Sequence, residues 1–268
     1  MTTAQNARAA ARRAADTPAL DRLARVGLAC RGVLYALIGV LAIQIALGSG
    51  GEQADKGGAI TTVAELPFGS VLLWVMVAGF AALALWQASE VLFGHLRPLD
   101  RAEAACKTVV YALIVFTLWS VLTVGRAASE DQKSQDVTGK LLDLPAGQLL
   151  VGVIGLGIVA LGVYWIRQGV TKKFREELEL GRMSPRTRSV MEKLGVAGYL
   201  ARGAIAGLAG IFVVQAALTH DPDKAGGIDA TLRAFADTPV GPWLLVLVAV
   251  GLMLFAGYCF GESRYRRT

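Results

Sequence analysis

The chain has 268 residues, of which 54% are hydrophobic and only 18% are charged, and its net charge is +6. This composition is too apolar for an ordinary soluble domain, and it excludes an intrinsically disordered chain. The apolar runs are continuous, unlike the short alternating segments of an outer-membrane barrel, so they favour a helical membrane protein.

Six segments carry no charged residue, and each is close to the ~20 residues that a helix needs to cross the hydrocarbon core. They cover residues 32–51, 66–89, 108–125, 144–166, 203–219 and 238–261. The predicted fold class is therefore all-α, a polytopic membrane protein with six transmembrane helices.

The basic residues predict the orientation of these helices. Of the 27 Lys and Arg residues, 21 lie in the N-terminal arm through Arg31, in residues 97–107, in residues 167–202 and in the C-terminal tail. The positive-inside rule then places both termini in the cytoplasm, in a bacterial inner (plasma) membrane. The net positive charge is thus a topology signal and does not indicate a nucleic-acid partner.

Comparison of the sequence with itself predicts an internal repeat. Shifts of 76 and 171 residues align Arg31 with Lys107 and with Arg202. The second halves align through LPFG at 66–69, LPAG at 144–147 and TPVG at 238–241. An even number of spans per unit gives all units the same orientation, so we expect three tandem helical hairpins with pseudo-threefold symmetry about the membrane normal.

The alignment also predicts local structure and boundaries. We expect Pro67, Pro145 and Pro239 in the first turn of the returning helices, where proline is well tolerated. Spaced apolar residues just before them predict a short amphipathic helix in each outer loop, and the alternative is an irregular loop. The expected units form one membrane domain: a basic arm (1–22), repeat 1 (23–96), repeat 2 (97–174), a basic connector (175–193) and repeat 3 with its tail (194–268).

At this point the residues resemble a known family. ARVGLACRGVLYALIGVLAIQIALG, GYLARGAIAGLAGIFVVQAAL, TVAELPFG and TLRAFADTPVG are similar to the bacterial membrane proteins grouped as domain of unknown function 1206. The resemblance implies three two-helix repeats, a mainly actinobacterial distribution, an inner-membrane location and no assigned reaction. The middle repeat departs from the pattern, with Lys107, Thr108 and Gln168 where the other repeats have Arg, Gly and Glu.

The repeat positions supply the candidate functional residues. The basic and acidic positions fall at the same end of each hairpin, which predicts pairing of Arg31 with Glu90 and of Arg202 with Glu262. In the middle unit the same two positions hold Lys107 and Gln168, so the carboxylate is lost there. Gly79, Gly157 and Gly251 share another repeat position, and we expect them to allow close packing of helices.

Two interpretations of the charged set remain open. In the first, the charges are ion pairs that close the hairpins and anchor the inner face. In the second, they converge on the symmetry axis and line a vestibule for an ion, an anion or a lipid headgroup, with Gln44 and Gln215 farther out. The first predicts a structural or partner-binding membrane component, and the second a small ion or solute transporter or channel.

The sequence shows no catalytic constellation. Its two histidines, His95 and His220, are too few for a zinc triad or a haem pair, and Cys30, Cys106 and Cys259 lack a CxxC pair. We therefore expect no enzyme activity, no cofactor and no metal, and we expect the cysteines to be small buried residues.

One basic connection is long. Its residues 167–194 predict that the fourth span continues to about Leu180, stops at Gly181 and is followed by a helix that starts after Pro185. With Arg8, Arg12 and Arg13 in the arm, this segment predicts a surface for anionic lipid headgroups or a membrane-protein partner. The alternative is a solvated helical face.

Overall fold

The computed structural model describes residues 18–48, 56–93, 98–124, 130–225 and 241–266. The basic arm up to residue 17 and residues 226–240 of the third outer loop, which include Pro239, lie outside the described residues. Six long helices contain the expected spans: α2 (Pro18–Ala46), α4 (Gly69–Phe93), α5 (Pro98–Val124), α7 (Gly147–Thr171), α8 (Pro185–Thr219) and α10 (Gly241–Tyr265). Each is long and apolar enough to cross a membrane. The chain is an all-helical, multi-pass membrane protein, as its composition predicts.

Short helices occupy the first two outer loops. α3 (Lys56–Glu65) and α6 (Glu130–Leu142) confirm the predicted helical segments there. Ile60 and Val63 of α3 are fully buried, whereas Val137 of α6 is exposed. Three 3₁₀ segments complete the described elements: η1 (Lys173–Glu177), η2 (Leu180–Arg182) and η3 (Pro222–Lys224).

The same tight turn precedes α4 and α7. The amide of Gly69 donates to the Leu66 carbonyl at 2.8 Å, and Gly147 donates to Leu144 at the same distance. The residue before each glycine, Phe68 in the first turn and Ala146 in the second, has a positive φ angle, 65° and 64°. A proline at the second position and a left-handed residue at the third define a type II turn.

This turn corrects the expected place of the prolines. Pro67 and Pro145 lie in the turn itself, because the left-handed residue that follows each one prevents the helix from beginning earlier. The fourth residue must be glycine, since a Cβ on Gly69 would overlap the Val63 carbonyl and one on Gly147 would overlap that of Leu141. α10 begins at the equivalent residue, Gly241.

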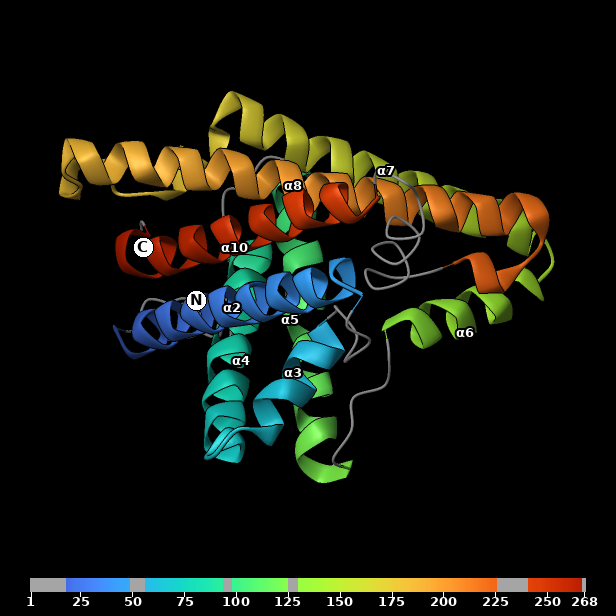
Figure 1. Ribbon diagram of the computed structural model, residues 1–268, viewed down its shortest axis with the longest axis horizontal. Helices are drawn as coiled ribbons and strands as arrows, with labels where there is room; N and C mark the ends of the chain where they lie inside the picture. Colours follow the sequence, from blue (N-terminus) through green and yellow to red (C-terminus); the bar gives the residue numbers. More distant parts are fainter. Residues whose placement is uncertain (1–17, 49–55, 94–97, 125–129, 226–240, 267–268) are drawn as a thin grey trace, which may run out of the picture.

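The six helices pack in the order α7, α8, α10, α2, α4 and α5, each on the next. In Figure 1, α7, α8, α10 and α2 run lengthwise, and α4 and α5 run across them. The hairpins of repeats 1 and 3 therefore close on themselves. The two helices of repeat 2 pack chiefly on their outer neighbours, α5 on α4 and α7 on α8. The pairs between repeats, α4 with α5, α7 with α8 and α10 with α2, are equivalent to one another, as threefold symmetry predicts, and the departure from symmetry lies within repeat 2.

Small residues set the closest helix contacts. A Cβ on Gly79 of α4 would lie 2.8 Å from the Cα of Gly27 of α2. Another face of α2 meets α10, where a Cβ on Gly32 would lie 3.1 Å from the Ala256 carbonyl oxygen. α2 therefore lies between α4 and α10, with a glycine at each contact.

The connector between α7 and α8 comprises residues 172–184 in the structure, and it folds back onto the bundle. α7 ends at Thr171 because Lys172 adopts a left-handed conformation (φ 55°), so the predicted continuation to Leu180 is wrong. The predicted helix start is confirmed: α8 begins at Pro185, and Ser184 caps it by accepting the Thr187 amide at 3.2 Å. Phe174 is buried in the connector, as are Leu178 and Met183.

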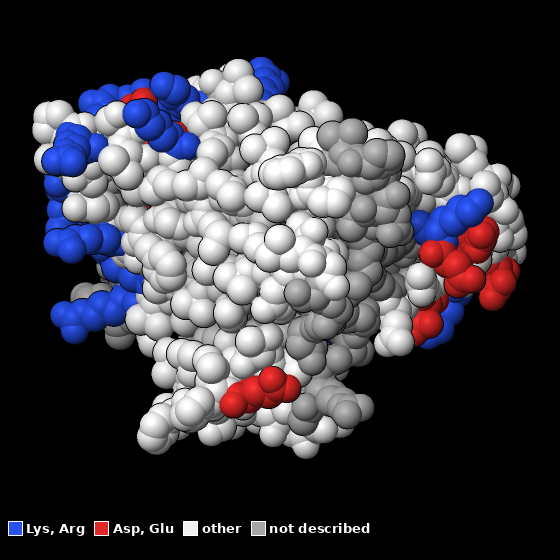
Figure 2. Space-filling view, in the orientation of Figure 1, with Lys and Arg blue, Asp and Glu red and all other residues white. Residues whose placement is uncertain are grey.

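Charged side chains gather at the two ends of the molecule. In the face shown in Figure 2, Lys and Arg cluster at the left end, where α10 ends and α8 begins. Acidic and basic side chains mix at the right end, over α6, and the broad surface between the ends is uncharged on this face except for a small acidic patch at its lower edge. This uncharged surface matches the apolar layer that a membrane protein presents to lipid.

Candidate functional site

Arg31 lies on α2 and makes polar contacts through all three guanidinium nitrogens. Nη2 donates to Oε2 of Glu262, Nη1 donates to the Tyr111 hydroxyl at 2.9 Å, and Nε lies 3.3 Å from Sγ of Cys259. The side chain is only 11% exposed. The predicted pairing with Glu90 is therefore wrong: the partner of Arg31 comes from α10, on which α2 packs more extensively than on α4.

Glu262 uses both carboxylate oxygens. Oε2 pairs with Arg31, and Oε1 accepts from Nη1 of Arg266 one helical turn farther along the chain. The residue is 1% exposed. A buried carboxylate is stable only where hydrogen-bonded partners compensate for lost hydration, and two guanidinium groups do so here. The predicted pair of Glu262 with Arg202 is therefore wrong.

The chain of charges continues into the connector. Arg266 Nη2 lies 3.6 Å from Oε2 of Glu177, and Oε1 of Glu177 lies 3.6 Å from Nζ of Lys107 on α5. Burial raises the pKa of Glu177, but Lys107 and Arg266 outweigh it and lower that pKa to about 2. Glu177 thus stays ionised near neutral pH.

These contacts make one alternating series, which we call the charge network. Its members are Arg31, Glu262, Arg266, Glu177 and Lys107. They come from all three repeats and from the connector, so this network ties together segments that are distant in sequence. Trp86 of α4 adds an aromatic face, because the Arg266 guanidinium lies 4.3 Å from its ring centroid.

Arg202 lies outside the network, in a cage of four aromatic rings. Its guanidinium carbon is 4.1 Å from the ring centroid of Trp165 and 4.5 Å from that of Phe255, and Tyr35 and Tyr199 lie within 6 Å. Its Nε is buried without a hydrogen-bond partner among the described residues. Cation–π attraction replaces the expected ion pair, since Glu262 is already paired with two other arginines.

The remaining acidic-position residues differ in their surroundings. Glu90 is half-buried on α4. Gln168 is buried, and its amide donates to the Tyr164 hydroxyl at 2.9 Å, while its carbonyl oxygen has no partner among the described residues. Gln44 and Gln215 are exposed on the surfaces of their helices. The structure therefore does not bring these four residues into the charge network.

The buried ring of Phe174 packs the connector against α8 and α10. The Phe174 ring stacks on Tyr199 with centroids 5.4 Å apart and meets Tyr258 edge-on at 5.3 Å. Gly195 makes the space, because a Cβ there would overlap the Phe174 ring. Sequence reasoning missed Phe174, Glu177 and Arg266. The available signals were apolar residues four apart in a charged segment and the four-residue spacing of Glu262 and Arg266.

The comparisons with known proteins follow the same three units. The model of the family described as Domain of Unknown Function (DUF1206) matches three times, over residues 26–94, 102–172 and 197–266. The chain belongs to this family. The matches confirm the three tandem repeats of this DUF1206 protein.

A curated relative adds no activity. The chain is 29% identical over 257 residues to the uncharacterized protein YxxB of Bacillus subtilis (strain 168), which covers 93% of this chain and 92% of that protein. No solved structure matches the chain.

The candidate glycines and the cysteines differ in burial and in contacts. Gly79 lies at the contact of α2 with α4, and Gly251 lies against Ala201, but Gly157 is exposed and a Cβ there would meet nothing within 4 Å. Gly155 and Gly162 make the close contacts of α7 instead. Cys30 and Cys259 are buried, whereas Cys106 is exposed, contrary to expectation. No metal-binding group of His, Cys, Asp or Glu occurs among the residues that the structure describes.

Proposed function

We propose that this protein is a non-enzymatic component of the bacterial inner membrane that acts as a scaffold for a partner protein at its cytoplasmic face. The charge network carries the proposal, because in it Arg31, Lys107 and Glu262 are each paired with charged groups of the protein itself. A network that joins all repeats and the connector builds a rigid platform at one end of the bundle. Because the desolvation of buried ion pairs offsets much of their attraction, we infer that these pairs serve to fix one arrangement of the repeats and the connector.

The same pairing argues against an ion-conducting vestibule. All three guanidinium nitrogens of Arg31 and both oxygens of Glu262 are engaged within the protein. A permeating ion needs polar groups that can replace its hydration shell. Side chains that already neutralise one another are poor candidates for that task.

The surface offered to a partner is the exposed basic face of the connector and the start of α8. It comprises Lys172, Lys173, Arg182, Arg186, Arg188 and Lys193. Glu192 lies among them and pairs with Lys172 at 3.1 Å, Arg175 at 3.3 Å and Arg188 at 3.6 Å. Glu179 also pairs with Arg182, at 2.8 Å, and Glu176 is exposed nearby, but the cations outnumber these carboxylates. The excess of positive charge suits an acidic partner surface.

A pull-down with charge-reversed variants tests the partner role. The full chain is extracted in mild detergent, and co-purifying proteins are quantified for wild type, for R186E/R188E and for Lys140→Glu, which reverses an exposed charge on α6 at the other end. We expect a stoichiometric partner that R186E/R188E loses and that the Lys140 variant keeps. Equal capture by all three proteins contradicts the proposal, and so does the absence of any stoichiometric partner.

The cytoplasmic location of both termini rests on the asymmetry of Lys and Arg along the chain. Reporter fusions test it independently of any partner. A green fluorescent protein fused after residue 268 is expected to fluoresce, and alkaline phosphatase inserted between residues 126 and 129 is expected to be active. The reverse pattern would invert the topology and move the basic face outside the cell.

A further inference from the structure

The hairpin of repeat 2 is open, in contrast to those of repeats 1 and 3. α2 packs on α4 and α8 packs on α10, but the described residues of α5 and α7 lack an extensive contact with each other. These two helices are also the least buried spans. In their most apolar stretches 22% of the α5 residues and 17% of the α7 residues are buried, against 33–50% in the other four spans. Each of them therefore exposes a face where the repeat predicts a hairpin partner.

The glycine of each returning helix marks the contact that closes a hairpin. A Cβ on Gly79 would lie 2.8 Å from the Cα of Gly27, and one on Gly251 would lie 2.5 Å from the Cβ of Ala201. Gly157 holds the same repeat position on α7 and is exposed, and a Cβ there would meet no described atom within 4 Å. Small residues at such positions let two helices approach closely. Repeat 2 thus has the small residue of the contact without the helix that the contact requires.

The other half of the contact is exposed on α5. The repeat aligns Ala201, which touches the Gly251 position, with Cys30 and with Cys106. Cys30 and Ala201 are buried, whereas Cys106 is exposed. Further exposed apolar residues follow at spacings of three or four on the same face of α5: Val109, Leu113 and Phe116. Both faces that would close the hairpin are therefore present in one chain but do not meet there.

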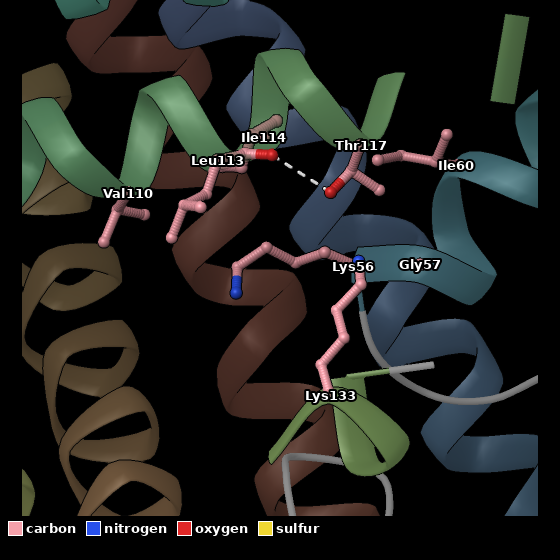
Figure 3. Close-up of a pocket in the computed structure, with 8 residues that line it drawn as sticks. All are labelled: Lys56, Gly57, Ile60, Val110, Leu113, Ile114, Thr117 and Lys133. Atoms are coloured by element: carbon pink, nitrogen blue, oxygen red, sulfur yellow. Dashed lines mark hydrogen bonds between the residues drawn. The ribbon is translucent and has the colours of Figure 1, made fainter. Parts of the chain in front are cut away.

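A small cavity shows that α7 does not fill this side of α5. Its volume is about 110 Å³, and residues of α3, α5 and α6 line it, whereas none of its described lining residues belongs to α7. In Figure 3, Val110 and Leu113 lie on this side of α5, next to the side chain of Lys56. Cys106 lies one helical turn before Val110, toward the cytoplasmic end and outside the cavity lining. The cytoplasmic half of this face is thus open to another helix.

A second copy of the chain supplies both missing helices. Copies in one membrane share the orientation that their Lys and Arg residues impose. The α5 helix of one copy and the α7 helix of another are then antiparallel, with Cys106 and Gly157 at the depths that a hairpin contact requires. Because each copy offers both faces, two such contacts related by a twofold axis close the assembly at a dimer.

We propose that the protein forms a dimer in which α5 of each copy packs against α7 of the other, with Cys106 against Gly157. Each copy completes the open repeat of its neighbour. The contact lies between membrane spans, away from the basic face, so it does not depend on the scaffold role. The single chain folds without it, and a change at Gly157 acts on association and not on the unfolding of the monomer.

Cysteine crosslinking of the full chain in native membranes tests the dimer. Gly157→Cys is expected to form a disulfide with Cys106 of a second copy when copper phenanthroline and oxygen accept the electrons of the two thiols. Most of this variant is then expected to migrate at the mass of a dimer without reductant. The matched control is Leu149→Cys, which places an exposed thiol just over two turns nearer the outer end of α7. Wild type and the Leu149 variant are expected to stay monomeric on the gel.

Chains with one thiol each distinguish a contact between copies from closure within one chain. C106S/G157C alone is expected to give no crosslinked dimer, and its co-expression with wild type is expected to restore one that contains both chains. Gly157→Cys without a dimer, a disulfide confined to one chain, or equal crosslinking of Leu149→Cys would each overturn the proposal.

Association without a crosslink provides a second measurement. Gly157→Trp places a large side chain in the proposed contact and is expected to weaken dimerisation about tenfold in mild detergent, as overpacking does. Sedimentation equilibrium measures this change, and thermal unfolding of the monomer checks that the variant is folded. A folded variant that associates like wild type would also overturn the proposal.

Discussion

Arg202 and Trp165 form a cation–π pair in which the guanidinium carbon lies 4.1 Å from the indole ring centroid. α8 and α7 supply the two residues, and these helices form the most extensive contact in the molecule. Arg202 is aligned with Arg31 in the repeat, yet its surroundings are aromatic where those of Arg31 are ionic. The charges of these two equivalent residues are therefore stabilised differently within the helix bundle, Arg31 by a carboxylate and Arg202 by aromatic rings.

A double-mutant cycle tests this pair. Arg202→Met and Trp165→Leu each remove one side of the contact and keep an apolar side chain of similar reach. We expect the two changes to be coupled by about 0.5–2 kcal/mol in the free energy of unfolding, the range for cation–π contacts from exposed to desolvated sites. Chemical denaturation in detergent measures it, and strictly additive effects would rule the interaction out.

Glu262→Gln is expected to destabilise the protein strongly, and Glu90→Gln is not. Removing the Glu262 charge leaves Arg31 and Arg266 buried without their common partner, a loss of about 3–5 kcal/mol. The change at Glu90 is expected to stay within about 0.5 kcal/mol, the usual range for a site outside such a network. Thermal unfolding of the two variants side by side measures the contrast. A larger loss of stability in the Glu90 variant would indicate that Arg31 pairs with Glu90 and not with Glu262.

Glu177 makes stability depend on pH in a definite window. Its pKa is lowered to about 2, from an ordinary value near 4.5, because Lys107 and Arg266 outweigh burial. The unfolded chain then binds the proton at higher pH than the folded chain, so the stabilisation is complete above about pH 4.5 and is lost as the pH falls toward 2.

We therefore expect Glu177→Gln to lower the unfolding temperature at pH 7 and to approach wild type as the pH falls from 4.5 to 2. Glu176→Gln, which neutralises the exposed neighbouring residue, serves as the control and is expected to match wild type at both pH values. A Glu177 effect that is constant from pH 7 to pH 2 would show that its charge is not the source of the stabilisation.

The glycines at one repeat position are expected to respond differently to alanine. A Cβ on residue 79 would lie 2.8 Å from the Gly27 Cα, and backbone cannot move aside cheaply, so Gly79→Ala is expected to cost about 1–3 kcal/mol. Gly157→Ala meets open space and is expected to be neutral or stabilising, by up to about 1 kcal/mol from helix propensity. Equal losses would mean that α7 packs through Gly157 after all.

The spans and the repeat could be predicted from sequence because their signals are local. A charge-free run gives the length of a span directly, and the recurring segments at 66–69, 144–147 and 238–241 align the returning helices, although the turn that they form was not predicted. Which carboxylate pairs with which arginine, in contrast, depends on contacts between helices that are distant in sequence. Alignment made Arg31 and Glu90 equivalent to Arg202 and Glu262, but it could not tell that α2 lies against α10, which depends on how the Gly27 and Gly32 faces of one helix are shared between two neighbours.

The connector was predicted least well, also for a physical reason. Its many charges favour a solvated helix by composition, yet Phe174 fits a space that Gly195 leaves open on another helix. Only the tertiary contact reveals that this aromatic residue is buried, and with it the position of Glu177. The helix start at Pro185 was predictable because Ser184 and Pro185 act on their immediate neighbours.

The ion pair of Arg31 with Glu262 also sets an order of events during synthesis. The two residues are 231 positions apart, and at ~5–20 residues per second the ribosome needs roughly ten to fifty seconds to pass from one to the other. Tyr111 arrives earlier, 80 positions after Arg31, and accepts one of its hydrogen bonds. The carboxylate comes only with the last helix, so the pair forms only when the chain is nearly complete. A chain truncated before α10 keeps an uncompensated arginine, which distinguishes an unfinished protein from a finished one.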